Sequence, residues 1–90
     1  MVHETVTSLD PAEVKARARR FFAERVPNTA AFPEGEGPGW LTLRGQGGEE
    51  VALSAVPDGA VTRVRASTLL FDQAVARFLS ILPRPVETGA

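Results

Sequence analysis

Two glycine-containing turns constrain the fold of this chain more than any other feature of its sequence. They are residues 45–48 (GQGG) and 57–59 (PDG), and β-rich segments flank them at 40–44, 49–56 and 60–68. Alternating residues on both sides of a short glycine turn are typical of antiparallel hairpins, and Pro-Asp-Gly favours a type I turn closed by a left-handed glycine. The sequence therefore predicts three consecutive antiparallel strands.

A further strand and a helix are expected before these hairpins. Residues 2–8 form a short β-branched run, which predicts a first strand. Asp10 can cap free helical N–H groups and Pro11 suits the first helical position, so a helix should begin there and run to about Arg25. Residues 27–39 hold three of the seven prolines and three of the eight glycines, which predicts an acidic loop.

The chain closes with a strongly apolar helix, which is expected to open at Leu70 or Phe71 and to end before Pro83. Residues 1–82 should therefore form one α+β domain with the order β-α-β-β-β-α. In this domain two helices pack on one face of an antiparallel four-stranded sheet. Residues 83–90 are expected to be an extended or disordered tail.

The turns suggest which side chains share a face of the sheet. We expect Val56 opposite Ala60 and Arg44 opposite Glu49, because these pairings close the two glycine turns. The core face then comprises Leu41, Leu43, Ala52, Ser54, Val56, Thr62, Val64 and Ala66, with Val2 and Val6 from the first strand. The opposite face comprises Trp40, Thr42, Arg44, Glu49, Val51, Leu53, Ala55, Val61, Arg63 and Arg65, with His3, Thr5 and Thr7.

This opposite face is the predicted binding surface. The solvated side of an antiparallel sheet is normally polar, but this one would be half apolar, with a tryptophan beside arginines and no lysine. Trp and Arg are enriched, and Lys depleted, where proteins bind proteins. We expect a second copy, another protein, a ligand or the acidic loop 33–39 to cover it; alternatively, arginine stems simply cover its apolar side chains. The candidate binding residues are Trp40, Arg44, Val51, Leu53, Arg63 and Arg65.

No catalytic, cofactor or metal site is predicted. The chain has no cysteine and His3 is its only histidine, so a His or Cys metal cluster is not expected. Glu34 and Glu36 lie in a glycine-rich loop, and Glu49 and Glu50 are adjacent in a strand and point to opposite faces, so neither pair is fixed for acid–base work. The glycine segments open no helix, unlike phosphate-binding loops. We expect a protein that is not an enzyme.

Charge and hydropathy also limit the partners. The net charge is −1, which does not fit a nucleic-acid partner, although Trp40 and the arginines of the predicted face could bind a single strand. Residues 11–31 hold five basic and two acidic side chains, whereas residues 32–60 hold five acidic and one basic. No apolar run approaches the roughly 18 residues of a membrane span, and the N-terminus lacks signal-peptide features. We expect a small soluble cytoplasmic protein.

Both ends of the chain resemble helix-grip proteins of the START and polyketide-cyclase type. Residues 5–14 (TVTSLDPAEV) are similar to the family's opening, in which a strand leads through a polar-Pro turn into a helix. Residues 62–67 (TRVRAS), followed by an amphipathic helix, are similar to its close. The family has more strands between these ends. The resemblance therefore implies a shortened helix-grip core with strand order 1-4-3-2, a reduced or absent ligand cavity, and a sheet completed by a second copy.

Two functions follow from these observations. The first is a non-enzymatic binding or assembly module that dimerises or docks a partner through the predicted face. The alternative is a miniature helix-grip protein that binds a small apolar ligand between the sheet and the C-terminal helix. Such a ligand would require a cavity lined by Phe22, Phe71 and Phe78.

Overall fold

The computed structural model of the chain describes residues 1–25 and 30–85. The expected break at Pro27 and the end of the expected tail, residues 86–90, lie outside this part. The elements are, in chain order, β1 (Val2–Thr7), α1 (Pro11–Ala23), β2 (Ala31–Gly37), β3 (Trp40–Gly45), β4 (Glu50–Asp58), β5 (Val61–Thr68) and α2 (Asp72–Ser80). The α+β class predicted from the sequence is therefore confirmed.

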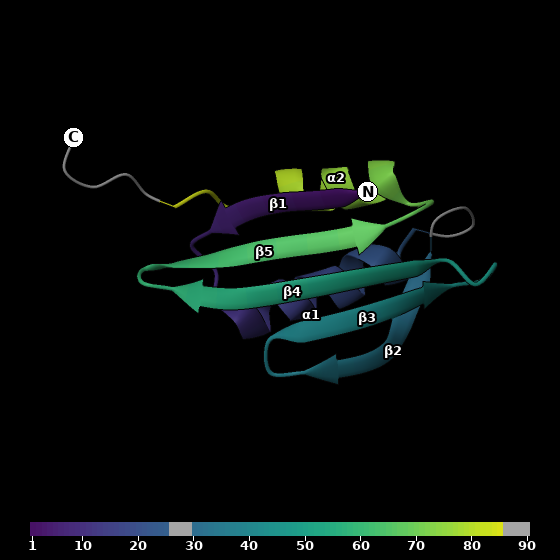
Figure 1. Ribbon diagram of the computed structural model, residues 1–90, viewed down its shortest axis with the longest axis horizontal. Coiled ribbons are helices and arrows are strands. Elements are labelled where there is room, and N and C mark those ends of the chain that lie inside the picture. The colour runs from purple at the N-terminus through teal and green to yellow at the C-terminus, as the bar shows by residue number, and fades with distance from the viewer. Residues whose placement is uncertain (26–29, 86–90) are drawn as a thin grey trace.

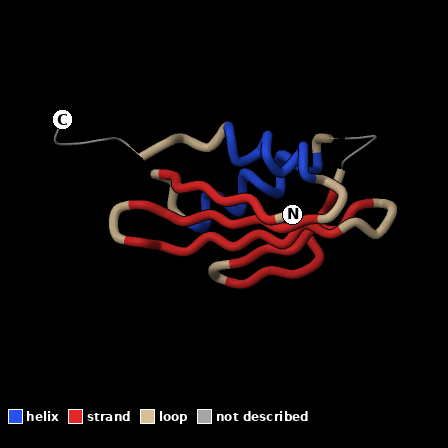
Figure 2. Tube along the Cα trace, turned by 45° about the horizontal axis from the view of Figure 1, so that its top comes forward, coloured by secondary structure: helices blue, strands red, loops and turns tan. Residues whose placement is uncertain are grey.

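One antiparallel sheet and two helices form two layers (Figure 1). The sheet order is β1-β5-β4-β3-β2, and every neighbouring pair is antiparallel. Both helices lie on the same side of the sheet, so its other side is open (Figure 2). The expected order of the first strand and the three hairpin strands is confirmed, but the sheet has five strands rather than four.

The additional strand, β2, comes from the segment that was expected to be an acidic loop. It pairs with β3, with a register shift between Pro33 and Gly35. The indole of Trp40 lies over its glycines: a Cβ on Gly37 would lie 2.9 Å from Cε2 of that ring. Glycine therefore leaves the space that this cross-strand contact needs, and the aromatic ring covers backbone that would otherwise be exposed.

The two helices begin close to where the sequence places them. At the start of α1, Asp10 Oδ1 accepts a hydrogen bond of 2.8 Å from the Glu13 N–H, as its capping role requires. Phe71 occupies the cap position of α2, so this helix begins one or two residues later than expected. The backbone after α2 returns to β1, where Thr7 Oγ1 donates to the Pro83 carbonyl oxygen at 2.5 Å.

The expected register of β4 is wrong. Asp58 lies opposite Val61, so the β4–β5 turn has two central residues, and Arg44 lies opposite Glu50 rather than Glu49. Because side chains alternate along a strand, the shift exchanges the two faces of β4. Val51 and Leu53 are therefore in the core, 0% and 3% exposed, instead of on the outer face.

The faces of β1 are likewise opposite to expectation. Val2 and Val6 are exposed on the open side of the sheet, whereas Thr7 is buried on the helix side. Polar partners on the helix side stabilise this arrangement: His3 Nε2 lies 2.9 Å from Asp72 Oδ1 of α2, and Thr7 binds the Pro83 carbonyl. The expected core positions of β3 and β5 are confirmed, with Leu41, Leu43, Thr62, Val64 and Ala66 buried.

Candidate docking face

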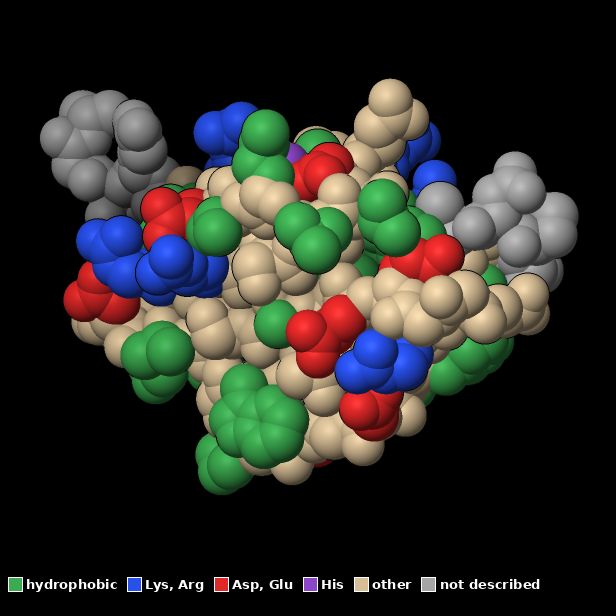
Figure 3. All heavy atoms as spheres, turned by 45° about the vertical axis from the view of Figure 1, so that its right-hand side comes forward, with side chains coloured by type: hydrophobic (Ala, Val, Ile, Leu, Met, Phe, Trp, Pro, Cys, Tyr) green, Lys and Arg blue, Asp and Glu red, His purple; other side chains and the backbone are tan. Residues whose placement is uncertain are grey.

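Large apolar side chains that remain exposed gather on one side of the molecule. Within residues 1–25 and 30–85, nine large hydrophobic side chains are exposed. Five of them lie on the open face of the sheet: Val2, Val6, Phe32, Trp40 and Val56. Figure 3 shows apolar side chains among charged ones on the side of the molecule that it presents. An exposed apolar cluster on a single face is typical of an interaction surface.

A shallow trough crosses the middle of the open face. Its floor contains small side chains, which are Thr42, Ala52, Ser54 and Ser67, and its rim is formed by Trp40, Val2 and Arg65. The hollow has a volume of about 390 Å³. Small residues on three adjacent strands, β3, β4 and β5, are bordered by the larger Trp40, Arg65 and Val2, which makes the face concave at its centre. A protruding side chain of a partner could therefore be received here.

Four of the six predicted binding residues are on this face. Trp40, Arg44, Arg63 and Arg65 are exposed there, with Trp40 46% exposed. The side chains of Val51 and Leu53 lie in the core, on the other side of the sheet. The positions that the sequence reasoning missed are Val2, Val6, Phe32 and Val56. With the correct register, the alternation of side chains within β1 and β4 would have placed Val2, Val6 and Val56 on the open face.

Each arginine of the face has a carboxylate neighbour. Arg63 Nε lies 2.6 Å from Asp58 Oδ2, and Arg65 Nε lies 3.9 Å from Glu4 Oε1. Arg44 pairs with Glu34, and this hydrogen bond holds the pKa of the Glu34 carboxyl below its ordinary value. The face therefore carries neighbouring charges of both signs.

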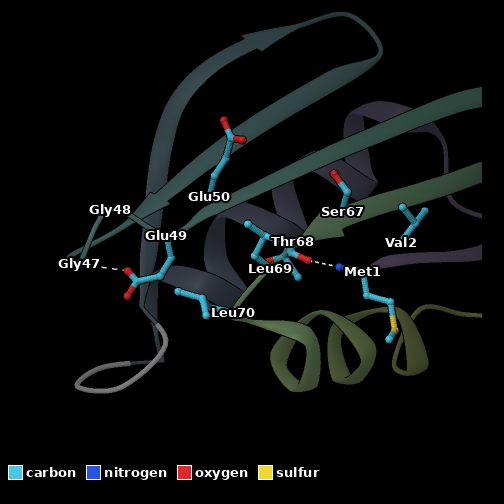
Figure 4. A pocket seen from close by; sticks show the side chains of 10 residues that line it. All are labelled: Met1, Val2, Gly47, Gly48, Glu49, Glu50, Ser67, Thr68, Leu69 and Leu70. Atoms are coloured by element: carbon cyan, nitrogen blue, oxygen red, sulfur yellow. Dashed lines mark hydrogen bonds between the residues drawn. The ribbon is translucent and has the colours of Figure 1, made fainter.

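A second hollow, of about 400 Å³, opens at the end of the sheet (Figure 4). It lies between Met1, the β3–β4 turn and the segment that joins β5 to α2. Leu69 and Leu70 of that segment are 87% and 72% exposed. Figure 4 shows Leu69 between Glu49 of the turn and Met1. Val2 and Ser67 line both hollows, so the trough continues from Trp40 to these leucines. The exposed apolar surface thus extends from the open face to the segment between β5 and α2 at the end of the sheet.

The basic face of α1 contacts its own chain. Lys15, which is buried, donates to the Gly37 carbonyl oxygen at 2.5 Å and to Glu36 at 3.2 Å, and Arg19 donates to the same carboxylate at 2.8 Å. These hydrogen bonds, that of Lys15 first, lower the pKa of Glu36 below its ordinary value. The cations of α1 therefore attach the acidic strand β2 to the helix layer.

Aromatic rings fill the space between the sheet and the helices. Phe22 and Phe78 are each 1% exposed, with ring centroids 6.0 Å apart, and Phe21 lies 5.3 Å from Phe78. Phe71 is buried beside Gly45 of β3. The three residues expected to line a ligand cavity are thus members of the packed core.

Comparisons with known proteins return nothing: no family model, no curated protein and no solved structure matches this chain. The described residues include no helix long and apolar enough to cross a membrane. In the same ranges, no group of three or more His, Asp or Glu side chains is placed to hold a metal ion.

Proposed function

We propose that this protein is a non-enzymatic assembly module that forms a homodimer through the open face of its sheet. The observation that carries the proposal is the concentration of exposed apolar side chains around Trp40 on the one sheet face that no helix covers. A solvated face would normally carry polar residues at these positions. Covering this face removes the apolar side chains from water, which favours association.

A second copy fits the charges of the face. Positive and negative side chains alternate across it, as in the pairs Arg63–Asp58 and Arg65–Glu4. In a two-fold dimer the same patch meets itself, so a surface of one sign would repel its copy. A patch with both signs can instead place the cations of one copy near the carboxylates of the other.

The size of the face fits a reversible dimer. Five strands at a spacing of about 4.8 Å, each about 25 Å long, give a footprint of about 600 Å² per copy and about 1,200 Å² in total. This total is at the lower end of the range for specific interfaces. We therefore expect a concentration-dependent dimer with Trp40 near its centre.

Light scattering coupled to gel filtration, over a wide range of protein concentrations, tests this proposal. Trp40→Ala combined with Arg63→Glu should raise the dissociation constant at least tenfold, because truncation of a central Trp typically costs about 2 kcal/mol or more. Ile81→Ala is the matched control, since Ile81 is exposed on the helix side, and it should leave the dimer unchanged. A wild-type chain that stays monomeric at every concentration would refute the proposal.

A further inference from the structure

The two edges of the sheet differ in how they are protected. Edge strands expose unpaired backbone groups, and natural proteins commonly blunt them with proline, glycine, bulges or charge. The edge strand β2 has all of these features, with Pro33, two glycines and a register shift. The other edge strand, β1, pairs regularly with β5 over six residues and contains neither proline nor glycine. β1 is therefore the edge to which a further strand can be added.

The hydrogen-bond pattern identifies the free groups of β1. The Thr68 N–H donates to the Met1 carbonyl oxygen at 3.0 Å, so residues 1, 3, 5 and 7 direct their backbone groups toward β5. Residues 2, 4 and 6 direct theirs outward. Further along, the Ser8 N–H donates to the Pro83 carbonyl at 3.3 Å, which closes that end of the edge. Within residues 1–25 and 30–85, the outward-facing N–H and C=O groups of Val2, Glu4 and Val6 have no backbone partner.

A groove runs beside this edge on the helix side. It has a volume of about 270 Å³ and lies between β1 and α2. The β1 side contributes His3 and Thr5, and the α2 side contributes Ala76, Leu79 and Ser80. A strand that added to β1 would direct every second side chain into this groove. Leu82 and Arg84 also line the groove, so its lining is partly apolar and partly polar. Its small volume favours small side chains at those positions.

The charge at the centre of the edge indicates the chemistry of the incoming strand. Glu4 is exposed on the open side, and its partner on β5 is Arg65. A basic residue on the other side of Glu4 would repeat this favourable cross-strand pairing. A second copy of β1 would not: the antiparallel register with most contacts, Val2 opposite Val6, places Glu4 opposite Glu4, and like charges directly opposite are destabilising.

We infer that the outer edge of β1 binds an extended peptide segment of another protein, which adds to the sheet as a sixth strand. The segment carries a basic residue opposite Glu4, apolar residues opposite Val2 and Val6, and small residues that face α2. Main-chain hydrogen bonds supply affinity and the alternating side chains supply specificity, as in other complexes formed by strand addition. This edge adjoins the open face proposed for dimerisation, to which the side chains of Val2, Glu4 and Val6 also belong, but the peptide binds through outward backbone groups that the dimer does not use.

A capped peptide with the pattern valine-alanine-lysine-alanine-valine, extended by threonine at both ends, tests this site on the ¹⁵N-labelled full chain. Chemical shifts of the Val2, Glu4 and Val6 amides should move on titration, and their hydrogen exchange should slow. The same peptide with glutamate in place of lysine should bind at least tenfold more weakly. No shift of these amides at millimolar peptide, or equal binding of both peptides, would overturn the inference.

Two variants of Glu4 sharpen the test. Glu4→Pro removes an outward N–H and no ladder hydrogen bond, so the fold should persist and the peptide affinity should fall at least tenfold. Glu4→Lys should reverse the preference to the glutamate peptide, and it tests the site even if the proline variant does not fold. Trp40→Ala should leave peptide binding unchanged, which separates this site from the dimer face. If Glu4→Pro abolished self-association in light scattering while Trp40→Ala did not, a second copy would be the occupant of the edge and the inference would be wrong.

Discussion

The two faces of the sheet are built from alternate residues of the same strands, yet their side chains lie in different environments. On the covered face, the side chains of β4 are Val51, Leu53 and Ala55, and the helices exclude water from them. On the open face of the same strand, Ala52 and Ser54 form the floor of the trough. The large side chain beside them, Trp40, lies over glycines of β2 and remains half-exposed.

This difference indicates separate roles for the two faces. The covered face contains the main core cluster of the domain, whereas the open face has large side chains that are exposed and charges that are paired locally. Substitutions on the covered face should therefore change the free energy of unfolding, and substitutions on the open face should mainly change association. Three experiments, described in order of decreasing expected effect, test this division.

The largest effect is expected from adjacent residues of β4. Leu53→Ala should lower the free energy of unfolding by about 2–5 kcal/mol, because it removes buried methyl groups and leaves a cavity. Ser54→Ala, one residue away on the open face, should change it by no more than about 0.5 kcal/mol. Urea denaturation at a single protein concentration measures both, since self-association would otherwise shift the result. A larger loss for Ser54→Ala would mean that the faces of β4 are exchanged.

The class of the fold and most of its elements could be predicted from local signals. The Asp10–Pro11 helix start, the glycine turns and the apolar stripe of the last helix each depend on short-range chemistry. The resemblance at the two chain ends also implied the order of four strands. The register of β4 could not be obtained in this way, because the turn 57–59 admits more than one closure. The structure closes it with Asp58 opposite Val61, and this choice depends on packing of Leu53 against the helix layer.

Strand β2 was missed for a similar reason. Pro33 and the glycines disfavour a strand in isolation, and only distant partners make one. These partners are the indole of Trp40 and the side chains of Lys15 and Arg19. For the candidate face, residue types placed Trp40 and the arginines on the open side, as the structure does, whereas the placement of Val51 and Leu53 depended on the register and was wrong.

An intermediate effect is expected where β2 meets Trp40. A Cβ on Gly37 would overlap the indole, so Gly37→Ala should destabilise the chain by about 1–3 kcal/mol. On a Trp40→Ala background the same change should cost almost nothing, because the overlapping ring is gone. Gly39→Ala is the matched control, since a Cβ there would meet only the Ala55 carbonyl oxygen at 3.4 Å. Equal costs of Gly37→Ala on both backgrounds would show that the indole does not lie over this glycine.

The smallest effect is expected from the two carboxylates of β2, which lie on opposite sides of the sheet. Glu36 binds buried Lys15 on the covered side, whereas Glu34 binds exposed Arg44 on the open side, and the pKa of each is lowered. A carboxyl whose pKa is lowered in the folded state contributes stability at pH values above its ordinary pKa of 4.5, and this contribution is lost as the pH falls through the folded-state pKa.

At neutral pH, Glu36→Gln should therefore lower the free energy of unfolding more than Glu34→Gln, because it leaves the ammonium of Lys15 with only the Gly37 carbonyl. Denaturation curves measured at several pH values below 5 should show both variants converging on the wild type. If Glu36→Gln and Glu34→Gln lowered the free energy of unfolding equally at neutral pH, burial on the covered side would not strengthen the Lys15–Glu36 ion pair.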